Sequence, residues 1–402
     1  MYMMGDFHRA DESDRSLIMP VRQGVIDRQI SGLRSRLDDA WQRHIGFPGT
    51  ADVDHTALAD LLTRYALNNI GDPFSPGAVP NHTRAFEVQV LDLAAELFRA
   101  PDGGWWGCVT SGSSEGTLLG LRNARRIFPE AVVVHSACAH YSVTKAADLL
   151  AMPTAKVPAT RRGEMDYHAL SGVLSQHRHR RPVIVATIGT TMTEAIDDLR
   201  RITAVCDRLG IGASDRYIHA DAALSGIPLA VAPLPGNPGF DLADGADSIT
   251  TSGHKFLSTL MPSGIYLSRN PHDGHGPHVD YLASHDTTIS GSRSGHLPLL
   301  LWHALARHGV DGLRRRAESA RARAAYAHSR LLEIGWPSWR HEHAFTVVLR
   351  RPPHELAERW ALPSSDDWSH LICMPGVSTS QVDAFIESLR LSRAMPATAG
   401  VQ

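Results

Sequence analysis

The sequence has few cysteines, no long apolar run and no excess of charge of either sign. Its four cysteines, Cys108, Cys138, Cys206 and Cys373, lie far apart and form no CxxC pair, so the sequence predicts neither a disulfide framework nor a structural zinc site. No apolar stretch reaches the roughly 18 residues of a membrane-spanning helix, and the polar beginning of the chain carries no signal-peptide core. We therefore expect a soluble protein of a reducing compartment, the cytoplasm.

Charge and phosphate-binding motifs narrow the class further. The 40 Lys and Arg residues against 42 Asp and Glu residues leave a net charge of -2, whereas a dedicated nucleic-acid or anionic-membrane binder needs a basic excess. The chain has no GxGxxG motif and no Walker lysine, so neither a dinucleotide nor a nucleoside triphosphate is indicated. We expect no nucleic acid and no membrane among its partners.

The 402 residues divide into three parts. Residues 1–70 form an N-terminal helical segment with apolar residues at helical spacing. Residues 71–295 alternate helical stretches with short apolar runs, which suit strands buried on both faces of a largely parallel α/β sheet. These runs are Ala131–Val134, Val183–Ile188, Tyr217–Ala220, Ser248–Thr251 and Gly264–Leu267. Residues 296–402 predict a smaller C-terminal α+β domain that begins with a long helix, Leu297–Leu332.

Five short motifs follow predicted strands at their carboxyl ends, where open α/β sheets bind ligands. Lys255 is placed to be a partly desolvated amine, which suits nucleophilic attack on a carbonyl group. The carboxylate of Asp221 suits a pyridinium nitrogen, and Gly112–Ser114 offer N–H groups at a helix N-terminus to a phosphate. His140 begins a segment that supplies an aromatic ring for a flat cofactor, and Thr191 supplies a hydroxyl.

Each of these motifs alone has an ordinary structural explanation. A lysine after a strand is usually a surface charge, and an Asp or a Gly/Ser turn commonly caps a helix. All five in this order, each at a strand end, are hard to obtain by chance.

The motifs together resemble a known family. The order TSGSSEGT, AHYSVTKA, ATIGTTMTEAIDD, HADAALSG, SGHKF and DYLASHDTTISGSRSGHLPLLLW is similar to the group II pyridoxal-phosphate amino-acid decarboxylases, over about residues 45–390. Within them it resembles most the branch of bacterial histidine decarboxylases and plant-type serine decarboxylases. The resemblance implies fold type I, the aspartate-aminotransferase-like architecture with a large seven-stranded sheet domain. It also implies a homodimer with active sites at the subunit boundary, and decarboxylation of an L-amino acid to an amine and carbon dioxide.

The resemblance assigns roles residue by residue. Lys255 would bind pyridoxal 5'-phosphate covalently, His140 would stack on its ring and Asp221 would pair with the ring nitrogen. Tyr281, in a lid over residues 270–290, is the candidate proton donor. The remaining cofactor ligands would be Gly112, Ser113, Ser114, Thr191, Ala223, Ser252 and His254.

Substrate choice is where the sequence departs from the family. The segment that carries Asn69, Asp72 and His82 resembles the serine decarboxylases and offers hydrogen-bonding groups, which favours a small polar substrate such as serine over histidine. The family's usual Lys and Gly are replaced by Thr193 and Glu194. These changes do not affect the cofactor prediction, but they bear on the choice of substrate in the pocket.

Two other classes of function remain open. A fold type I aminotransferase would use the same lysine and aspartate, with Arg350 or Arg351 as a carboxylate clamp, although the His254–Lys255 pair favours decarboxylation. A non-catalytic, His-rich binding protein is the alternative outside enzymes. The two His-rich loops, residues 177–179 and 272–278, lack carboxylate or Cys partners at ligand spacing, so no metal site is predicted.

Overall fold

The computed structural model describes residues 22–49 and 52–394, and its contacts divide the chain between His44 and Ile45. Of the predicted N-terminal segment, residues 1–21, 50 and 51 lie outside the described residues. The first unit contains helix α1 (Gln23–Trp41), none of whose residues is buried. Within the described residues, no helix is long and apolar enough to cross a membrane.

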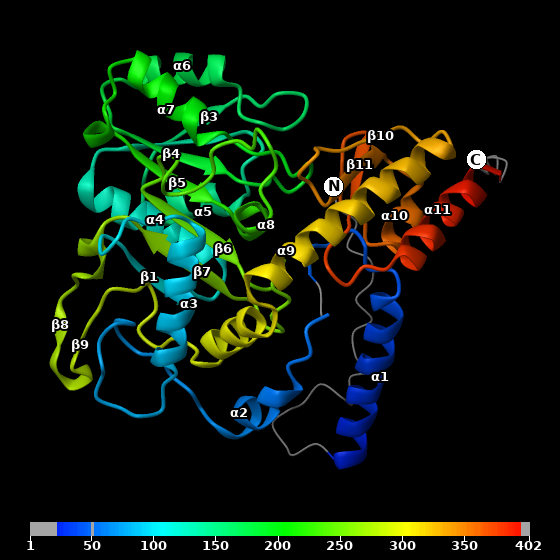
Figure 1. Cartoon of the computed structure of the whole chain (residues 1–402), viewed down its shortest axis with the longest axis horizontal. Coiled ribbons are helices and arrows are strands. Elements are labelled where there is room, and N and C mark those ends of the chain that lie inside the picture. The colour runs from blue at the N-terminus through cyan, green and yellow to red at the C-terminus, as the bar shows by residue number, and fades with distance from the viewer. Residues whose placement is uncertain (1–21, 50–51, 395–402) are drawn as a thin grey trace. The chain divides into compact units, whose positions relative to one another are not determined.

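The second unit is built on a seven-stranded sheet in the order β1-β7-β6-β5-β4-β2-β3 (Figure 1). Its strands are β1 (Trp106–Thr110), β2 (Val132–Ser136), β3 (Thr154–Val157), β4 (Pro182–Thr187), β5 (Tyr217–Asp221), β6 (Ser248–Ser252) and β7 (Gly264–Ser268). Strand β7 alone runs against its two neighbours, and the other pairs are parallel. The prediction of a largely parallel α/β sheet is therefore confirmed.

Helices cover both faces of this sheet because its strands are apolar on both sides. The helices are α3 (Arg84–Leu97), α4 (Ser113–Ile127), α5 (Ser142–Leu149), α6 (Tyr167–Gln176), α7 (Leu199–Arg208) and α8 (Gly226–Val231). In β4, Val183 and Val185 share a hydrophobic cluster with residues of α4 and α5, whereas Ile184 and Ala186 share another with residues of α3, α6, α7 and α8. Before them lies the short helix α2 (Ala59–Arg64).

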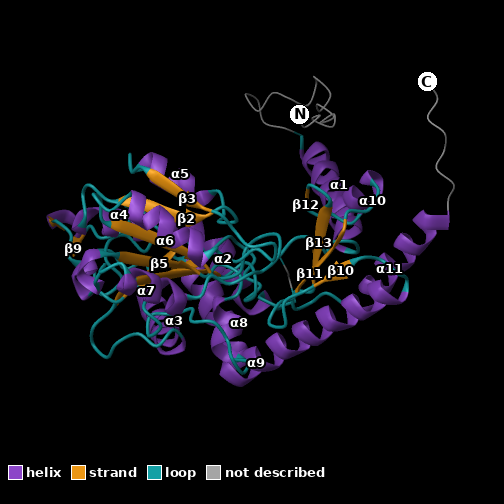
Figure 2. Cartoon of the chain, turned by 90° about the horizontal axis from the view of Figure 1, so that it is seen from above, coloured by secondary structure: helices purple, strands orange, loops and turns teal. Residues whose placement is uncertain are grey.

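The C-terminal part is a smaller α+β domain, which Figure 2 shows beside the large sheet. Its antiparallel sheet has the order β10-β11-β13-β12. The strands are β10 (Ser338–Trp339), β11 (Thr346–Arg350), β12 (Ser364–Ser365) and β13 (Trp368–Ile372), and the helices are α9 (His296–Glu333), α10 (His354–Arg359) and α11 (Thr379–Ala394). The predicted long helical stretch Leu297–Leu332 corresponds to α9, in which Gly309, with a φ of 58° and a ψ of 177°, marks a kink between two helices.

Candidate active site

A cavity of about 550 Å³ lies at the carboxyl ends of the large sheet and is closed on one side by the small domain. Residues of strands β4, β5 and β6, and of the segments that follow β1 and β2, line it. All ten predicted cofactor ligands line this one cavity; they are Gly112, Ser113, Ser114, His140, Thr191, Asp221, Ala223, Ser252, His254 and Lys255. The carboxyl edge of the sheet therefore brings together residues that are up to 143 positions apart in the sequence.

Lys255 and Asp221 form the charged centre of the cavity. Burial lowers the pKa of the Lys255 ammonium, and the negative charge of Asp221 acts against that change. Burial raises the pKa of Asp221, while the positive charges of Lys255 and His140 oppose the rise. The Asp221 carboxylate accepts one long hydrogen bond, 3.4 Å from the Ala223 N–H. A buried carboxylate with so little hydrogen bonding suits a cationic N–H group in the cavity.

His140 supplies an aromatic face to the same cavity. Its Nδ1 lies 2.8 Å from the Ser142 hydroxyl, and its ring lies 4.1 Å from that of Tyr141. Burial, followed by the charge of Lys255, lowers the pKa of this imidazole. A neutral ring fixed by a hydrogen bond is suited to packing on a flat heteroaromatic group.

The start of helix α4 has features that suit the binding of an anion. No side chain caps the helix at Gly112, which has a φ of 150°. The Ser113 and Ser252 hydroxyls lie 2.7 Å apart beside it, and Glu115 accepts the N–H of Ser111. Free N–H groups and hydroxyls at a helix N-terminus suit a phosphate. Together with the lysine and the under-bonded aspartate, they fit pyridoxal 5'-phosphate.

Two of the predicted substrate ligands lie outside the cavity lining and are engaged elsewhere. The amide of buried Asn69 donates to Glu87 at 2.6 Å and accepts the N–H of Thr83 at 2.8 Å. The carboxylate of Asp72 accepts the Trp106 indole N–H at 2.9 Å and the N–H of Phe74 at 2.8 Å. In this chain both residues hold the loop that precedes α3, and substrate binding by them stays a prediction.

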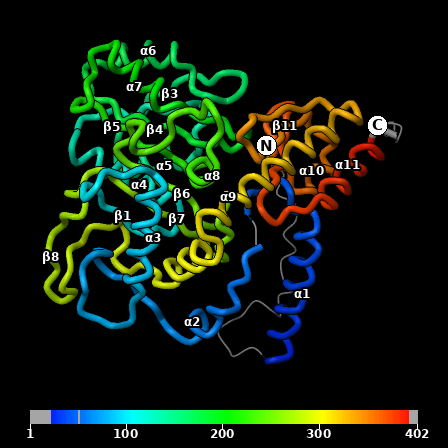
Figure 3. Tube along the Cα trace, viewed as in Figure 1, coloured from blue at the N-terminus to red at the C-terminus, as the bar shows by residue number. Residues whose placement is uncertain are grey.

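The other two predicted residues also lie away from the cavity lining. His82 lies just before α3, where its Nδ1 accepts the Arg84 N–H at 3.4 Å. Tyr281 is 79% exposed and lies in a short turn (Asp280–Leu282) of the hairpin formed by strands β8 (His278–Val279) and β9 (Ser284–His285). Figure 3 traces this hairpin at the edge of the large domain away from β11. Its role as proton donor stays a prediction.

No sequence motif predicts the small-domain wall of the cavity. His370 and Ile372 of β13 line this wall, and so does Phe47, which lies shortly before residues 50 and 51. Burial lowers the pKa of His370 to about 4, so this imidazole is neutral near pH 7. No sequence motif surrounds these residues, since β13 reaches the cavity only through the tertiary structure.

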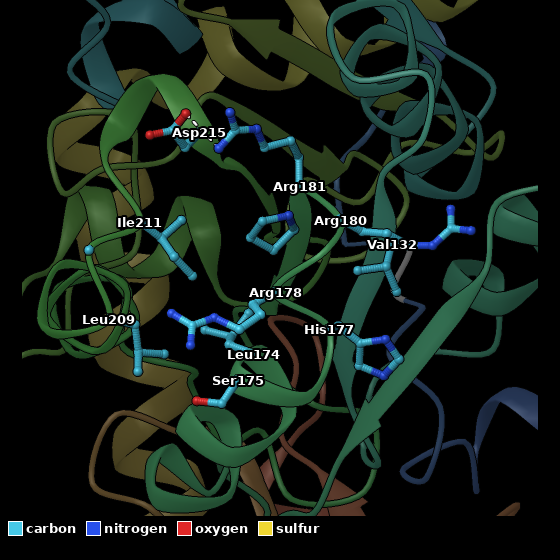
Figure 4. Close-up of a pocket in the computed structure, with 12 residues that line it drawn as sticks. Val132, Leu174, Ser175, His177, Arg178, Arg180, Arg181, Leu209, Ile211 and Asp215 are labelled. Atoms are coloured by element: carbon cyan, nitrogen blue, oxygen red, sulfur yellow. Dashed lines mark ion pairs between the residues drawn. The ribbon is translucent and has the colours of Figure 1, made fainter.

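A second cavity, of about 240 Å³, lies at the opposite, amino-terminal edge of the sheet (Figure 4). It is lined by His177 and Arg178 of one of the His-rich loops, and by Arg181, which pairs with Asp215 at 2.7 Å. None of the ten predicted cofactor ligands lines it. Among the described residues, no group of three or more His, Cys, Asp or Glu side chains is arranged to hold a metal ion.

One cavity at the carboxyl edge of this sheet brings together a lysine, a buried carboxylate and an uncapped helix N-terminus. This arrangement is typical of a fold type I pyridoxal-phosphate enzyme. The chain belongs to the pyridoxal-dependent decarboxylases, because residues 44–335 match the family described as the pyridoxal-dependent decarboxylase conserved domain. It is thus an amino-acid carboxy-lyase with pyridoxal 5'-phosphate as its cofactor.

Known proteins agree with this assignment. The chain is 40% identical to histidine decarboxylase of Mesorhizobium japonicum, over 90% of this chain and 97% of that protein. It is 35% identical to serine decarboxylase 3 of Oryza sativa subsp. japonica, over 88% and 79%. A crystal structure of L-methionine decarboxylase from Streptomyces sp. 590 superposes with a TM-score of 0.84 at 26% identity, covering 92% of this chain and 96% of that one.

Proposed function

We propose that this decarboxylase acts on L-histidine and that the ten cavity residues hold its cofactor. The observation that carries the cofactor roles is the single cavity, which collects a lysine, a buried carboxylate and an uncapped helix end. When bound, the cofactor supplies the electron sink that accepts the electron pair of the breaking bond to the carboxylate.

The chain's own residues would orient the cofactor and neutralise its charges. Asp221 holds the proton on the ring nitrogen, because its buried carboxylate is an acceptor with a strong need for a donor. Lys255 Nζ is the attaching amine, and burial favours its neutral, nucleophilic form. The α4 N-terminus, with the Ser113 and Ser252 hydroxyls, binds the phosphate. His140 supplies the aromatic face against the ring.

Histidine is favoured by kinship and by the walls of the cavity. The relative at 40% identity is a histidine decarboxylase that the chain covers almost entirely. Phe47, Tyr141 and His370 line the cavity, and aromatic walls suit a flat imidazole better than a hydroxymethyl group.

Serine is the second candidate. It is favoured by the serine decarboxylase relatives and by the resemblance of the segment around Asn69 and Asp72. The polar atoms of these two side chains are, however, engaged within the chain, which weakens the argument for a serine hydroxyl site.

Steady-state kinetics decide between the two substrates. The holoenzyme is assayed for carbon dioxide and amine release with each of the common amino acids, and Lys255→Ala serves as the inactive control. We expect kcat/KM for L-histidine to exceed that for L-serine by at least about tenfold. A preference for serine, or for an amino acid outside these two, would overturn the substrate proposal and leave the decarboxylase assignment standing.

We also propose that the enzyme is a homodimer whose active sites lie at the subunit boundary. Exposed apolar side chains lie in and next to the cavity lining. Tyr141 and Phe47 line the cavity and are 67% and 54% exposed, and Leu260 and Met261 are also exposed. Pro262, the next residue after Met261, lines the cavity itself. An apolar patch at this place suits a subunit interface.

The cytoplasm is the compartment we propose. Cys138 is exposed and none of the four cysteines is paired, and an exposed thiol stays reduced in a reducing compartment. Fractionation of cells that express the protein natively tests this proposal.

A further inference from the structure

Glu194 is a buried carboxylate in the loop that follows β4. It is 1% exposed and has a φ of 55°, in the left-handed region that disfavours a side chain. A residue with a side chain persists in this conformation only where its surroundings hold it there.

The carboxylate is held by donors from two parts of the fold. Its Oε2 accepts the N–H of Phe345 at 3.0 Å, the N–H of Thr346 at 2.9 Å and the Thr346 hydroxyl at 2.7 Å. Its Oε1 accepts the Ser225 hydroxyl at 3.2 Å. The backbone carbonyl of Glu194 also accepts His343 Nε2 at 2.8 Å. One residue therefore ties the loop after β4 to the first residue of β11 in the small domain.

Strand β11 in turn carries the small-domain wall of the cavity. In the antiparallel register, Thr346 pairs with Ile372, and Val348 pairs with His370. Both Ile372 and His370 line the cavity. The other end of the tie also reaches it, because Thr191 lies in the loop of Glu194 and also lines the cavity.

We propose that Glu194 is a positioning residue that fixes β11, and through it the β13 wall of His370 and Ile372, against the large domain. The substrate's side chain then meets a wall of fixed position. This inference rests on the proposed site but not on the identity of the substrate. The negative charge of Glu194 also favours the charged form of Lys255, raising its pKa, so the tie lies within electrostatic reach of the attaching amine.

Loss of the tie should weaken substrate binding more than the chemical step. A displaced wall removes contacts made equally in the ground state and the transition state, which raises KM and leaves kcat nearly unchanged. Loss of a residue that only stabilises the fold would lower the melting temperature without raising KM relative to kcat.

Three variants test the proposal on the holoenzyme. Glu194→Gln keeps the size and removes the charge, and places an amide N–H₂ against donors. Glu194→Gly relaxes the left-handed backbone but deletes the tie. Thr346→Val removes one donor to the carboxylate and leaves Glu194 itself unchanged. The matched control is Asp197→Asn, a buried carboxylate of the same segment that accepts N–H groups of the large domain, from Met165 and Thr187.

We expect both Glu194 variants to raise KM by about tenfold or more with kcat within about threefold. Thr346→Val should raise KM less, and should add less than about twofold in the Glu194→Gln background, because the two residues act as one unit. Hydrogen exchange at the amides of residues 345 and 346 should become at least about tenfold faster in the Glu194 variants. Asp197→Asn should lower the melting temperature and leave KM and these two amides unchanged.

Three results would overturn the proposal. They are unchanged exchange at residues 345 and 346 in Glu194→Gln, a KM within about twofold of the wild type, and an equal rise of KM in Asp197→Asn. If the Glu194 variants do not fold, the KM and exchange of Thr346→Val decide the question. Exchange is measured without substrate, so it tests the tie even if no substrate is turned over.

Discussion

Asp221 and Lys255 show how neighbouring strand ends create reactivity from ordinary side chains. Strands β5 and β6 are parallel neighbours, so the last residue of one and the turn after the other meet at the same edge of the sheet. Burial disfavours the charge on each group, and each charge favours the other. Neither residue would have a perturbed pKa if it lay on the surface.

Replacing Asp221 with asparagine tests its role on the ring nitrogen. The amide keeps the shape but cannot hold that nitrogen protonated, so kcat should fall by about 10² or more while the cofactor stays bound. The apoprotein should be at least as stable as the wild type, because the substitution removes a buried charge. Steady-state kinetics, a cofactor titration and thermal unfolding of the apoprotein measure the three expectations. Near-normal turnover in Asp221→Asn would reduce Asp221 to a structural residue.

At the scale of elements, the sequence predicted the strands that are apolar and missed those that are not. The runs for β2, β4, β5, β6 and β7 were located within one or two residues of the observed bounds. The direction of β7 could not be predicted, because an apolar run reads the same in a parallel and an antiparallel strand. Strand β13 contains Ser369 and His370 and carries no such run, so its contribution to the cavity was missed.

The same distinction applies to the residues of the candidate site. Residues that directly follow apolar strands were predicted, because the carboxyl edge of a parallel sheet collects them. His370 depends on how a second domain docks, which local pattern does not encode. Asn69 and Asp72 were predicted from polarity and resemblance, and polarity cannot distinguish a ligand group from a buried hydrogen-bonding residue that holds a loop.

Gly309 gives a prediction at the element scale. An added Cβ would meet nothing within 4 Å, so alanine is opposed only by the left-handed backbone. Gly309→Ala should therefore cost about 1–3 kcal/mol of unfolding free energy. Gly172, within α6, also has open space around an added Cβ but no positive φ, and Gly172→Ala should gain about 0.5–1 kcal/mol. Urea denaturation measures both, and similar effects of the two substitutions would contradict the assigned conformation of Gly309.

At the scale of the whole molecule, large apolar side chains that line the cavity of the second unit are exposed. Tyr141 is 67% exposed and Phe47 is 54% exposed. Monomeric proteins seldom leave such side chains together on the surface, so this part of the second unit favours a second subunit.

The homodimer gives the last prediction. Sedimentation should show a dimer at all working concentrations. Tyr281 is exposed and lies away from the cavity lining of its own chain, so a lid that carries it would act on the neighbouring subunit.

Mixed dimers test this sharing of sites directly. Lys255→Ala and Tyr281→Phe homodimers should each lose at least about tenfold in kcat. A mixed dimer of the two, purified through two different tags, contains one site with both residues intact and one with neither. It should therefore recover about half of the wild-type activity. Failure to recover, with both parent dimers inactive, would mean that the lid serves its own subunit. A fully active monomer in sedimentation would contradict the homodimer itself, because each chain would then complete its site alone.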